Sequence, residues 1–307
     1  MSAGLALHAP AKVNLFLHVL CRRADGYHDL ESLIVFVDVG DRLTVSPARD
    51  LSLTIGGPFA PLLAHEPVAD NLVFRAGTML RDKAGVSAGA RVVLEKHLPI
   101  AAGLGGGSAD AAAALRLLTA HWTADLPRDD LHALGLALGA DIPVCIESRP
   151  AFAAGVGEIL TETPRLPDLW AVLVNSGTPV PTGKVFKGLD PDALAGVCGP
   201  TVPPEAFNDA QSFVEALKAT RNDLEPPALR VAPDIADVLD VIAAQPGCRL
   251  ARMSGSGGTC FGLFAAEAEA QTAARAILDQ RPAWWARPGA LLQAAPNLVA
   301  DPAVQPA

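Results

Sequence analysis

The chain has 307 residues, of which 50% are hydrophobic and 19% charged, a composition typical of a globular protein with a sizeable core in one or two domains. Its formal net charge is −9 and it has no run of Lys and Arg residues, which argues against a basic groove for nucleic acid. No segment reaches the roughly 18 consecutive apolar residues that a membrane helix needs, and the five scattered cysteines form no C-x-x-C pair. We therefore expect a cytoplasmic protein that binds neither nucleic acid nor membrane.

The first third of the chain is predicted to be mainly β-structure. Strands are expected at residues 12–20 (KVNLFLHVL) and in LESLIVFVDVG, DRLTVSP and LSLTIGG, and RRADGY supplies a turn. Apolar residues at helical spacing from Leu72 predict a helix that stops near Gly85. RVVLEK returns to strand, and a helix is expected from about Ser108, its N-cap, to His121.

The remainder mixes helices and strands without strict alternation. LPRDDLHALGLALGAD predicts a helix, DLWAVLVNSG a strand, and RLARMSGSGGTCFGLF two strands joined by a glycine turn, with further helices near 206–219, 233–244 and 267–279. This order favours an α+β fold over a doubly wound parallel sheet. We expect one domain at 1–160, a second at 161–294, and a disordered tail at 295–307.

The most informative stretch is residues 98–118, LPIAAGLGGGSADAAAALRLL, in which four glycines precede an alanine-rich helix. Glycine lets a ligand approach the backbone closely, and a helix N-terminus offers free N–H groups and partial positive charge. The stretch therefore predicts a phosphate site, with a tight packing turn as the alternative. No Lys follows the glycines as in a P-loop, and Ser108 stands where a dinucleotide loop needs its third glycine.

Several segments resemble the GHMP kinase superfamily, which is named for galactokinase, homoserine kinase, mevalonate kinase and phosphomevalonate kinase. They are PAKVNLFLHVLCRRADGYHDLESL, LPIAAGLGGGSADAAAALRLL, LGADIPV, GVGEIL and MSGSGGTCFGLF, which span about residues 9–265. The resemblance implies an N-terminal domain like domain 2 of ribosomal protein S5 and a ferredoxin-like C-terminal domain. RADGYH with PAKVNLFL is similar to members that use ATP to phosphorylate the 2-hydroxyl of a cytidine diphosphate derivative of methylerythritol.

The same resemblance assigns the catalytic pair. It implies that Asp141 in GADIP is the base and that Lys12 in PAKVN is a supporting cation. A carboxylate beside an ammonium can orient a hydroxyl group for in-line attack on a phosphoryl group. Taken alone, Asp141 reads as a turn or capping residue and Lys12 as a solvated strand end.

Binding residues also follow from the resemblance. Asn71 and Lys96 are expected near the adenosine of ATP, and the loop that covers its phosphates comprises Pro99, Ile100, Ala101, Ala102, Gly103, Leu104, Gly105, Gly106, Gly107, Ser108 and Ala109. Mg²⁺ is expected with ATP, but the sequence identifies no ligands for it. The glycine turn at 254–258 either closes over the phosphates or only packs between two strands, and NDLEPP (222–227) reads as a capped turn.

The resemblance further implies a clamp for cytosine. Tyr27, His28 and Phe186 are expected to hold the base, with Thr182 and Asn14 near the polar groups of the substrate. An aromatic ring can stack on a pyrimidine and an imidazole can hydrogen-bond its edge, although residues 27 and 28 alone would read as an ordinary turn.

Two further functions stay open from sequence. One is a homoserine or mevalonate kinase on the same fold, and the other is a non-catalytic ATP sensor, for which the pair Lys12 and Asp141 would have no use. The spacing of the glycines argues against a dinucleotide-dependent oxidoreductase. The sequence is compatible with a monomer or a homodimer.

Overall fold

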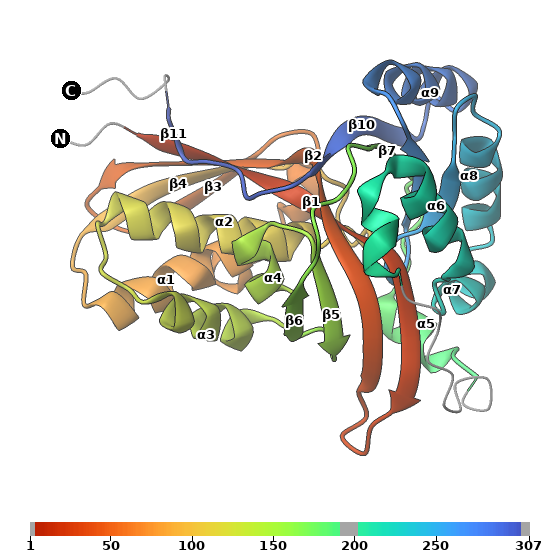
Figure 1. Cartoon of the computed structure of the whole chain (residues 1–307). Coiled ribbons are helices and arrows are strands. Elements are labelled where there is room, and N and C mark those ends of the chain that lie inside the picture. Colours follow the sequence, from red (N-terminus) through yellow and green to blue (C-terminus); the bar gives the residue numbers. More distant parts are fainter. Residues whose placement is uncertain (1–3, 191–201, 302–307) are drawn as a thin grey trace.

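A continuous sheet joins the two halves of the molecule (Figure 1). The computed structural model describes residues 4–190 and 202–301. Within these residues the sheet has eleven strands: β1 (Leu5–Arg22), β2 (His28–Ala48), β3 (Ser52–Gly56), β4 (Gly89–Glu95), β5 (Ala151–Gly155), β6 (Ile159–Glu162), β7 (Trp170–Asn175), β8 (Leu250–Met253), β9 (Thr259–Phe264), β10 (Trp285–Leu292) and β11 (Val299–Ala300).

Strand β2 holds the sheet together because it meets different partners along its length. One edge pairs with β1, and the two strands form a hairpin that extends well beyond the rest of the sheet (Figure 1). The other edge pairs with β4 through residues 42–48, with β10 through 36–37 and with β5 through 30–34. Since β10 comes from the C-terminal part of the chain, the two halves share backbone hydrogen bonds.

Helices cover both halves. They are α1 (Leu72–Ala84), α2 (Gly106–His121), α3 (Arg128–Leu138), α4 (Ile142–Glu147), α5 (Thr182–Lys187), α6 (Ala210–Ala219), α7 (Glu225–Val231), α8 (Asp234–Ala243) and α9 (Glu267–Gln280). Helix α2 contacts the sheet as well as α1 and α4, and Ala111, Ala112 and Ala114 on it are fully buried. Its small side chains let all these neighbours approach closely, so the alanine-rich sequence makes α2 the centre of the N-terminal core.

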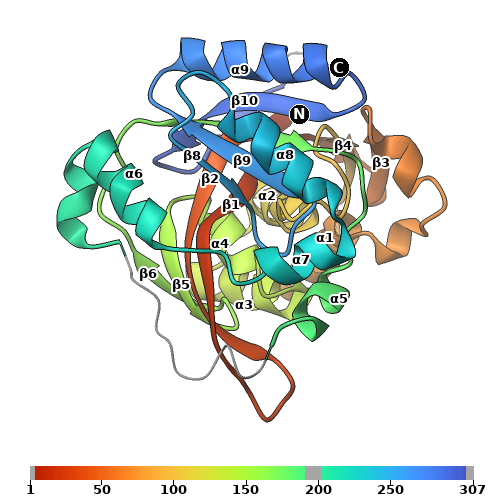
Figure 2. The ribbon, with the colours of Figure 1, turned by 90° about the vertical axis from the view of Figure 1, so that its right-hand side faces the viewer.

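The C-terminal half has the ferredoxin-like topology that the sequence predicted. Its strands pair antiparallel in the order β10-β7-β9-β8, with helices between β7 and β8 and α9 between β9 and β10. Helices α8 and α9 pack on this sheet (Figure 2). Together with the N-terminal half, this confirms the predicted α+β fold. The domain limits 1–160 and 161–294 stay a prediction, because sheet and core run across them.

The prediction of a disordered tail was wrong for residues 295–301. Val299 and Ala300 form β11, which pairs with Leu5 and Ala6 of β1, so the first and last strands lie side by side (Figure 1). Asp301 is 5% exposed and accepts a hydrogen bond from Arg42 Nη2 at 3.1 Å. A short proline-containing tail can thus become ordered by adding to an open sheet edge. Residues 302–307 lie outside the described residues. No helix among the described residues is long and apolar enough to cross a membrane.

Candidate active site

The glycine-rich segments of both halves meet at a cavity of about 650 Å³. Its walls come from β1 and β2, the loop before α2, the start of α4, α5 and the turn between β8 and β9. We call residues 99–109 the phosphate loop and residues 254–258 the second glycine turn. A cavity of this size can hold most of a nucleotide-sized ligand.

The phosphate loop has the open backbone that its glycines predicted. Gly103 and Gly105 have φ of +73° and +61°, in the left-handed region that favours glycine. Most residues of the loop line the cavity, whereas Leu104 and Ala109 are buried behind it, 1% and 3% exposed. The loop therefore presents backbone to the cavity while its larger apolar side chain anchors it in the core.

Helix α2 begins earlier than the sequence suggested. Gly105 is the N-cap and Gly106 the first helical residue, so the prediction of Ser108 as N-cap was wrong. The left-handed Gly105 turns the chain into the helix without a capping side chain, and its carbonyl accepts from Ala109 N at 2.8 Å. Ser108 is thereby left in the first turn of α2, where it lines the cavity.

Lys12 and Asp141, 129 positions apart in the chain, lie together at the cavity. Lys12 Nζ donates to Asp141 Oδ1 at 3.2 Å and to Asn14 Oδ1 at 3.4 Å. The lysine side chain is 8% exposed and the aspartate side chain 43%, so the carboxylate faces the cavity while the ammonium supports it from behind. Lys12 N also donates to Leu104 O at 2.9 Å, which joins β1 to the phosphate loop.

Asn14 completes this corner of the site. Its Nδ2 donates to Ser32 Oγ at 2.7 Å, and Ser32 Oγ donates to Phe16 O at 2.6 Å. These bonds fix the rotamer of Asn14 and thereby hold its Oδ1 beside the Lys12 ammonium. Nothing in the sequence pointed to Ser32, which lies on β2 directly before an apolar run.

Lys96 has partners that the sequence did not suggest. Its Nζ donates to Asp41 Oδ2 at 2.5 Å and to Asp110 Oδ2 at 2.7 Å, and the three side chains are at most 4% exposed. Burial lowers the pKa of Lys96, but the two carboxylates outweigh burial and raise it. Burial raises the pKa of Asp110, against the opposing effect of Lys96. Lys96 lines the cavity, and its contact with adenosine stays a prediction.

Asn71 has a structural role beside the cavity. Its Oδ1 accepts from Val73 N at 2.9 Å, so it caps α1. It lines the cavity together with its neighbours Asp70 and Leu72. Leu72 lies beside the phosphate loop, because a Cβ built at Gly107 would be 3.7 Å from Leu72 Cδ1.

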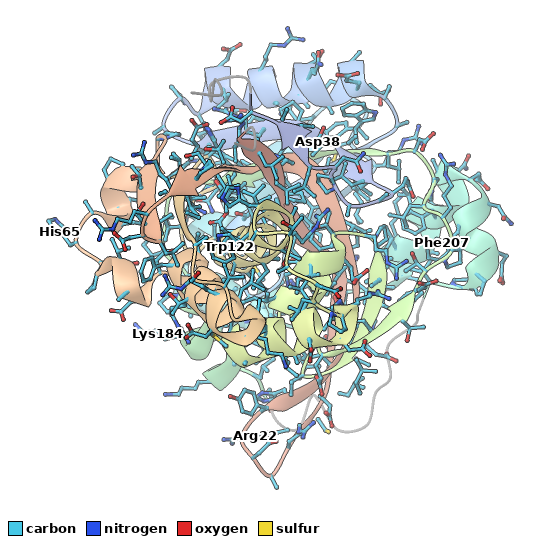
Figure 3. The ribbon with its side chains drawn as sticks, turned by 90° about the vertical axis from the view of Figure 1, so that its left-hand side faces the viewer. Arg22, Asp38, His65, Trp122, Lys184 and Phe207 are labelled. Carbon is cyan, nitrogen blue, oxygen red and sulfur yellow. The ribbon has the colours of Figure 1, made fainter. Side chains whose placement is uncertain are left out.

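The structure brings together two of the three residues expected to clamp cytosine. The rings of His28 and Phe186 have centroids 5.3 Å apart at 34°, and Phe186 and Thr182 on α5 line the cavity. Burial, with the nearby Arg22, lowers the pKa of His28. Tyr27 is 65% exposed near the outer end of the β1–β2 hairpin, where Figure 3 labels Arg22. Tyr27 does not line the cavity.

The second glycine turn packs directly against the phosphate loop. A Cβ built at Gly103 would lie 2.5 Å from Gly257 O, so only glycine fits at Gly103. Gly255 and Ser256 line the cavity, and Ser256 Oγ is 2.8 Å from Thr182 Oγ1. The turn therefore packs against the phosphate loop and also lines the cavity, and its closure over the phosphates stays a prediction.

Comparison with known proteins identifies the class of protein that has this fold. Residues 71–149 match the model of the GHMP kinases N terminal domain and residues 205–282 that of the GHMP kinases C terminal domain. A homoserine kinase structure from Cytophaga hutchinsonii shares the fold with a TM-score of 0.75 at 17% identity, covering 97% of this chain and 98% of that one. The chain is thus a GHMP kinase, with both domains of that class and its fold.

More similar proteins define the family. The chain is 53% identical over 288 residues, 92% of its length and 98% of the relative's, to a 4-diphosphocytidyl-2-C-methyl-D-erythritol kinase of Cereibacter sphaeroides. A crystal structure of 4-(cytidine 5'-diphospho)-2C-methyl-D-erythritol kinase has a TM-score of 0.77 at 39% identity, covering 93% of this chain and 98% of that one. The chain belongs to the 4-diphosphocytidyl-2-C-methyl-D-erythritol kinase family.

Proposed function

We propose that the chain transfers the γ-phosphoryl group of ATP to the 2-hydroxyl of 4-diphosphocytidyl-2-C-methyl-D-erythritol, giving the 2-phosphate and ADP. This reaction belongs to the non-mevalonate route to isopentenyl diphosphate. The observation that carries the proposal is the pair Lys12 and Asp141, 3.2 Å apart at a cavity that the phosphate loop also lines. An acceptor hydroxyl and a terminal phosphate can meet there.

Asp141 is proposed to orient the acceptor hydroxyl and to accept its proton. Phosphoryl transfer depends mainly on positioning and charge stabilisation, and the acceptor side needs one group that can hold the hydroxyl in line. The exposed face of the Asp141 carboxylate is available for this, because Lys12 contacts only its Oδ1. Lys12, anchored between Asn14 and Asp141, is proposed to offset negative charge as the phosphoryl group moves.

The phosphate loop is proposed to hold the phosphates of ATP. Helix α2 starts at Gly106, so its first N–H groups have no partner within the helix and point towards the loop. These groups and the positive end of the helix dipole favour a polyphosphate. The remaining predicted ATP contacts, Asn71 and Lys96, lie along the same cavity.

The residues at the cavity fit a Mg²⁺ ion that ATP brings with it. No group of three or more His, Cys, Asp or Glu residues within 4–190 and 202–301 is arranged to hold a metal by itself. Magnesium commonly binds through one or two carboxylates together with phosphate oxygens and water. Asp110 Oδ1 is buried with no hydrogen-bond partner among the described residues, so Asp110, with Ser108, would hold the ion. The ion would neutralise charge on the phosphates.

The cytidine end of the substrate is proposed to bind between α5 and the β1–β2 hairpin. Phe186 offers a ring face beside His28, and Thr182 and Asn14 offer polar groups on the path from this ring to Asp141. Stacking of one base on an aromatic side chain contributes about 1–3 kcal/mol. Tyr27 would have to move inward to take part in the clamp, since it is 65% exposed.

The proposal includes a setting for the enzyme. We propose a cytoplasmic location, which the free state of Cys21, Cys145, Cys248 and Cys260 supports. All residues of the proposed site come from one chain, so a monomer and a homodimer would each carry complete sites.

The catalytic assignment is tested with Asp141→Asn, which keeps the shape of the side chain and removes its basicity. Loss of a general base typically costs about 10²- to 10⁴-fold in rate. We expect a loss of turnover in this range with ATP affinity unchanged, measured by coupled ADP release and by equilibrium titration with a fluorescent ATP analogue. Turnover within about twofold of the unmodified chain would refute the role of Asp141.

A further inference from the structure

The segment NDLEPP (222–227) reaches the cavity through Leu224, and its first side chain is tied to the second glycine turn. Asn222 is 6% exposed. Its Nδ2 donates to Met253 O at 2.9 Å and to Gly255 O at 2.8 Å, and its Oδ1 accepts from Leu224 N at 3.0 Å. Both N–H groups of the amide therefore go to the residues that enter the turn.

The second glycine turn has two backbone hydrogen bonds of its own, from Gly257 N to Ser254 O at 3.1 Å and from Ser254 N to Thr259 O at 3.0 Å, but three of its five residues are glycines. Gly255, Gly257 and Gly258 have φ of +56°, +104° and +92°, and glycine restricts its backbone less than any other residue. The turn contacts both β1 and the phosphate loop through Ser254. Ser254 Oγ accepts from Asn14 N at 3.2 Å and donates to Gly103 O at 3.2 Å. A shift of the turn would therefore reach both sides of the site.

Asn222 is itself held in place against β1. Leu17 N donates to Arg221 O at 3.0 Å, and Asp223 N donates to Leu17 O at 2.9 Å. Asp223 Oδ2 also accepts from Val19 N at 2.8 Å. These three bonds flank Asn222 on both sides, so its amide projects from a backbone that is fixed to the same strand that carries Lys12.

Glu225 holds the same point of the turn from the other direction. Its Oε2 accepts from Met253 N at 3.1 Å, while Asn222 takes Met253 O. The backbone N–H and C=O groups of Met253 are thus both bound by side chains of one short segment. Because side chains of this segment bind both backbone groups of Met253, the base of the turn has a fixed position relative to β1.

We infer that Asn222, assisted by Glu225, is a positioning residue for phosphoryl transfer: it sets the second glycine turn so that Gly255 and Ser256 face the cavity against the phosphate loop. Asn222 touches no reacting atom and acts through the turn. The inference rests on the proposed function. A displacement of about 1 Å in a group that positions a reactant can cost about 10²-fold in rate.

The test replaces Asn222 by Asp. Asn222→Asp keeps the size of the side chain and its acceptor for Leu224 N, but it sets a carboxylate oxygen against Met253 O and Gly255 O. We expect kcat with 4-diphosphocytidyl-2-C-methyl-D-erythritol to fall about 10- to 100-fold, because the turn must move. The KM for ATP should change less than kcat, because the first N–H groups of α2, which are proposed to bind the phosphates, lie outside the turn.

Thr220→Val is the matched control. Thr220 is 4% exposed, and its hydroxyl accepts from Arg252 Nη1 at 2.9 Å and donates to Leu217 O at 2.6 Å. The variant therefore loses two buried hydrogen bonds two residues from Asn222, and neither bond reaches the turn. We expect its melting temperature to fall as in Asn222→Asp, with kcat within about twofold of the unmodified chain.

A second pair of variants serves if Asn222→Asp folds poorly. Glu225→Ala removes the acceptor of Met253 N and should lower kcat about 3- to 10-fold, whereas Glu225→Gln keeps an acceptor and should restore it. Equal kcat for Glu225→Ala and Glu225→Gln, or equal losses for Asn222→Asp and Thr220→Val at the same folded fraction, would overturn the inference. Absence of turnover in the unmodified chain would overturn the proposed function and this inference with it.

Discussion

The buried cation Lys96 allows a quantitative test of how the N-terminal core is held together. Its ammonium lies between Asp41 and Asp110, and all three side chains are at most 4% exposed. Lys96→Met keeps roughly the length of the side chain and removes its charge. Asp41 retains the N–H groups of His97 and Leu98 as partners, but Asp110 is left without one among the described residues.

The expected cost follows from that difference. Removing one partner of a buried ion pair costs about 3–5 kcal/mol, and the orphaned Asp110 places Lys96→Met within this range. Lys83→Met is the control, because Lys83 pairs with Asp130 at 3.1 Å with side chains 46% and 39% exposed. An exposed pair of this kind contributes about 0–1 kcal/mol.

Urea-induced unfolding of the purified variants measures both costs. Adding Asp110→Asn to Lys96→Met should recover part of the loss, because it removes the carboxylate that no longer has a cation. The reasoning would be refuted if Lys96→Met cost no more than Lys83→Met, or if the second substitution deepened the loss.

Three further predictions concern the phosphate loop, a buried histidine and the cytidine site. Gly103→Ala would place Cβ 2.5 Å from Gly257 O, so we expect turnover in the ADP-release assay to fall about 10²-fold. Gly177→Ala is the control, because Gly177 has a similar left-handed φ but its Cβ would have no atom within 4 Å, and this variant should leave the rate unchanged. Burial lowers the pKa of His18 below 6.5, so the stability that the neutral imidazole contributes is present above about pH 6.5 and is lost as the pH falls. The melting temperature of His18→Gln should therefore fall less between pH 7 and pH 5 than that of the unmodified chain. An equal fall in the two proteins would contradict this. Phe186→Ala should raise the KM for the cytidylyl substrate about tenfold and leave the KM for ATP unchanged in initial-rate measurements, and an unchanged cytidylyl KM would remove Phe186 from the clamp.

The local pattern of the sequence predicted most of the elements, because each signal lay within a few residues. A run of β-branched and aliphatic residues without Gly or Pro marked β1, and helical spacing with Gly85 at its end marked α1. The glycine cluster before α2 likewise marked a bare helix N-terminus at the cavity. These features depend on neighbours in sequence, and so a single chain is enough to recognise them.

Contacts between distant residues could not be read in the same way. Asp41 follows a glycine at the end of an apolar run and looks like a turn residue, yet it lies buried against Lys96. Asn222 stands in a segment that reads as a capped turn, and its partners are 31 and 33 positions further along the chain. A polar residue reveals such a role only when the fold supplies its partners.

Predictions that went beyond the local pattern failed for the tail and succeeded for the contact between Lys12 and Asp141. Composition alone suggested disorder after residue 294, but the open edge of β1 orders Val299 and Ala300. The pairing of Lys12 with Asp141 was expected only through resemblance to a family, since neither residue is distinctive alone. The structure confirms that the two side chains meet.

The most direct test of the central claim is a coupled ADP-release assay of the unmodified chain with Mg-ATP and three acceptors: 4-diphosphocytidyl-2-C-methyl-D-erythritol, homoserine and mevalonate. We predict turnover with the cytidylyl acceptor alone. Turnover with homoserine or mevalonate in its place would keep the kinase fold and contradict the proposed substrate. ATP binding without turnover on any acceptor would contradict the catalytic role of Lys12 and Asp141.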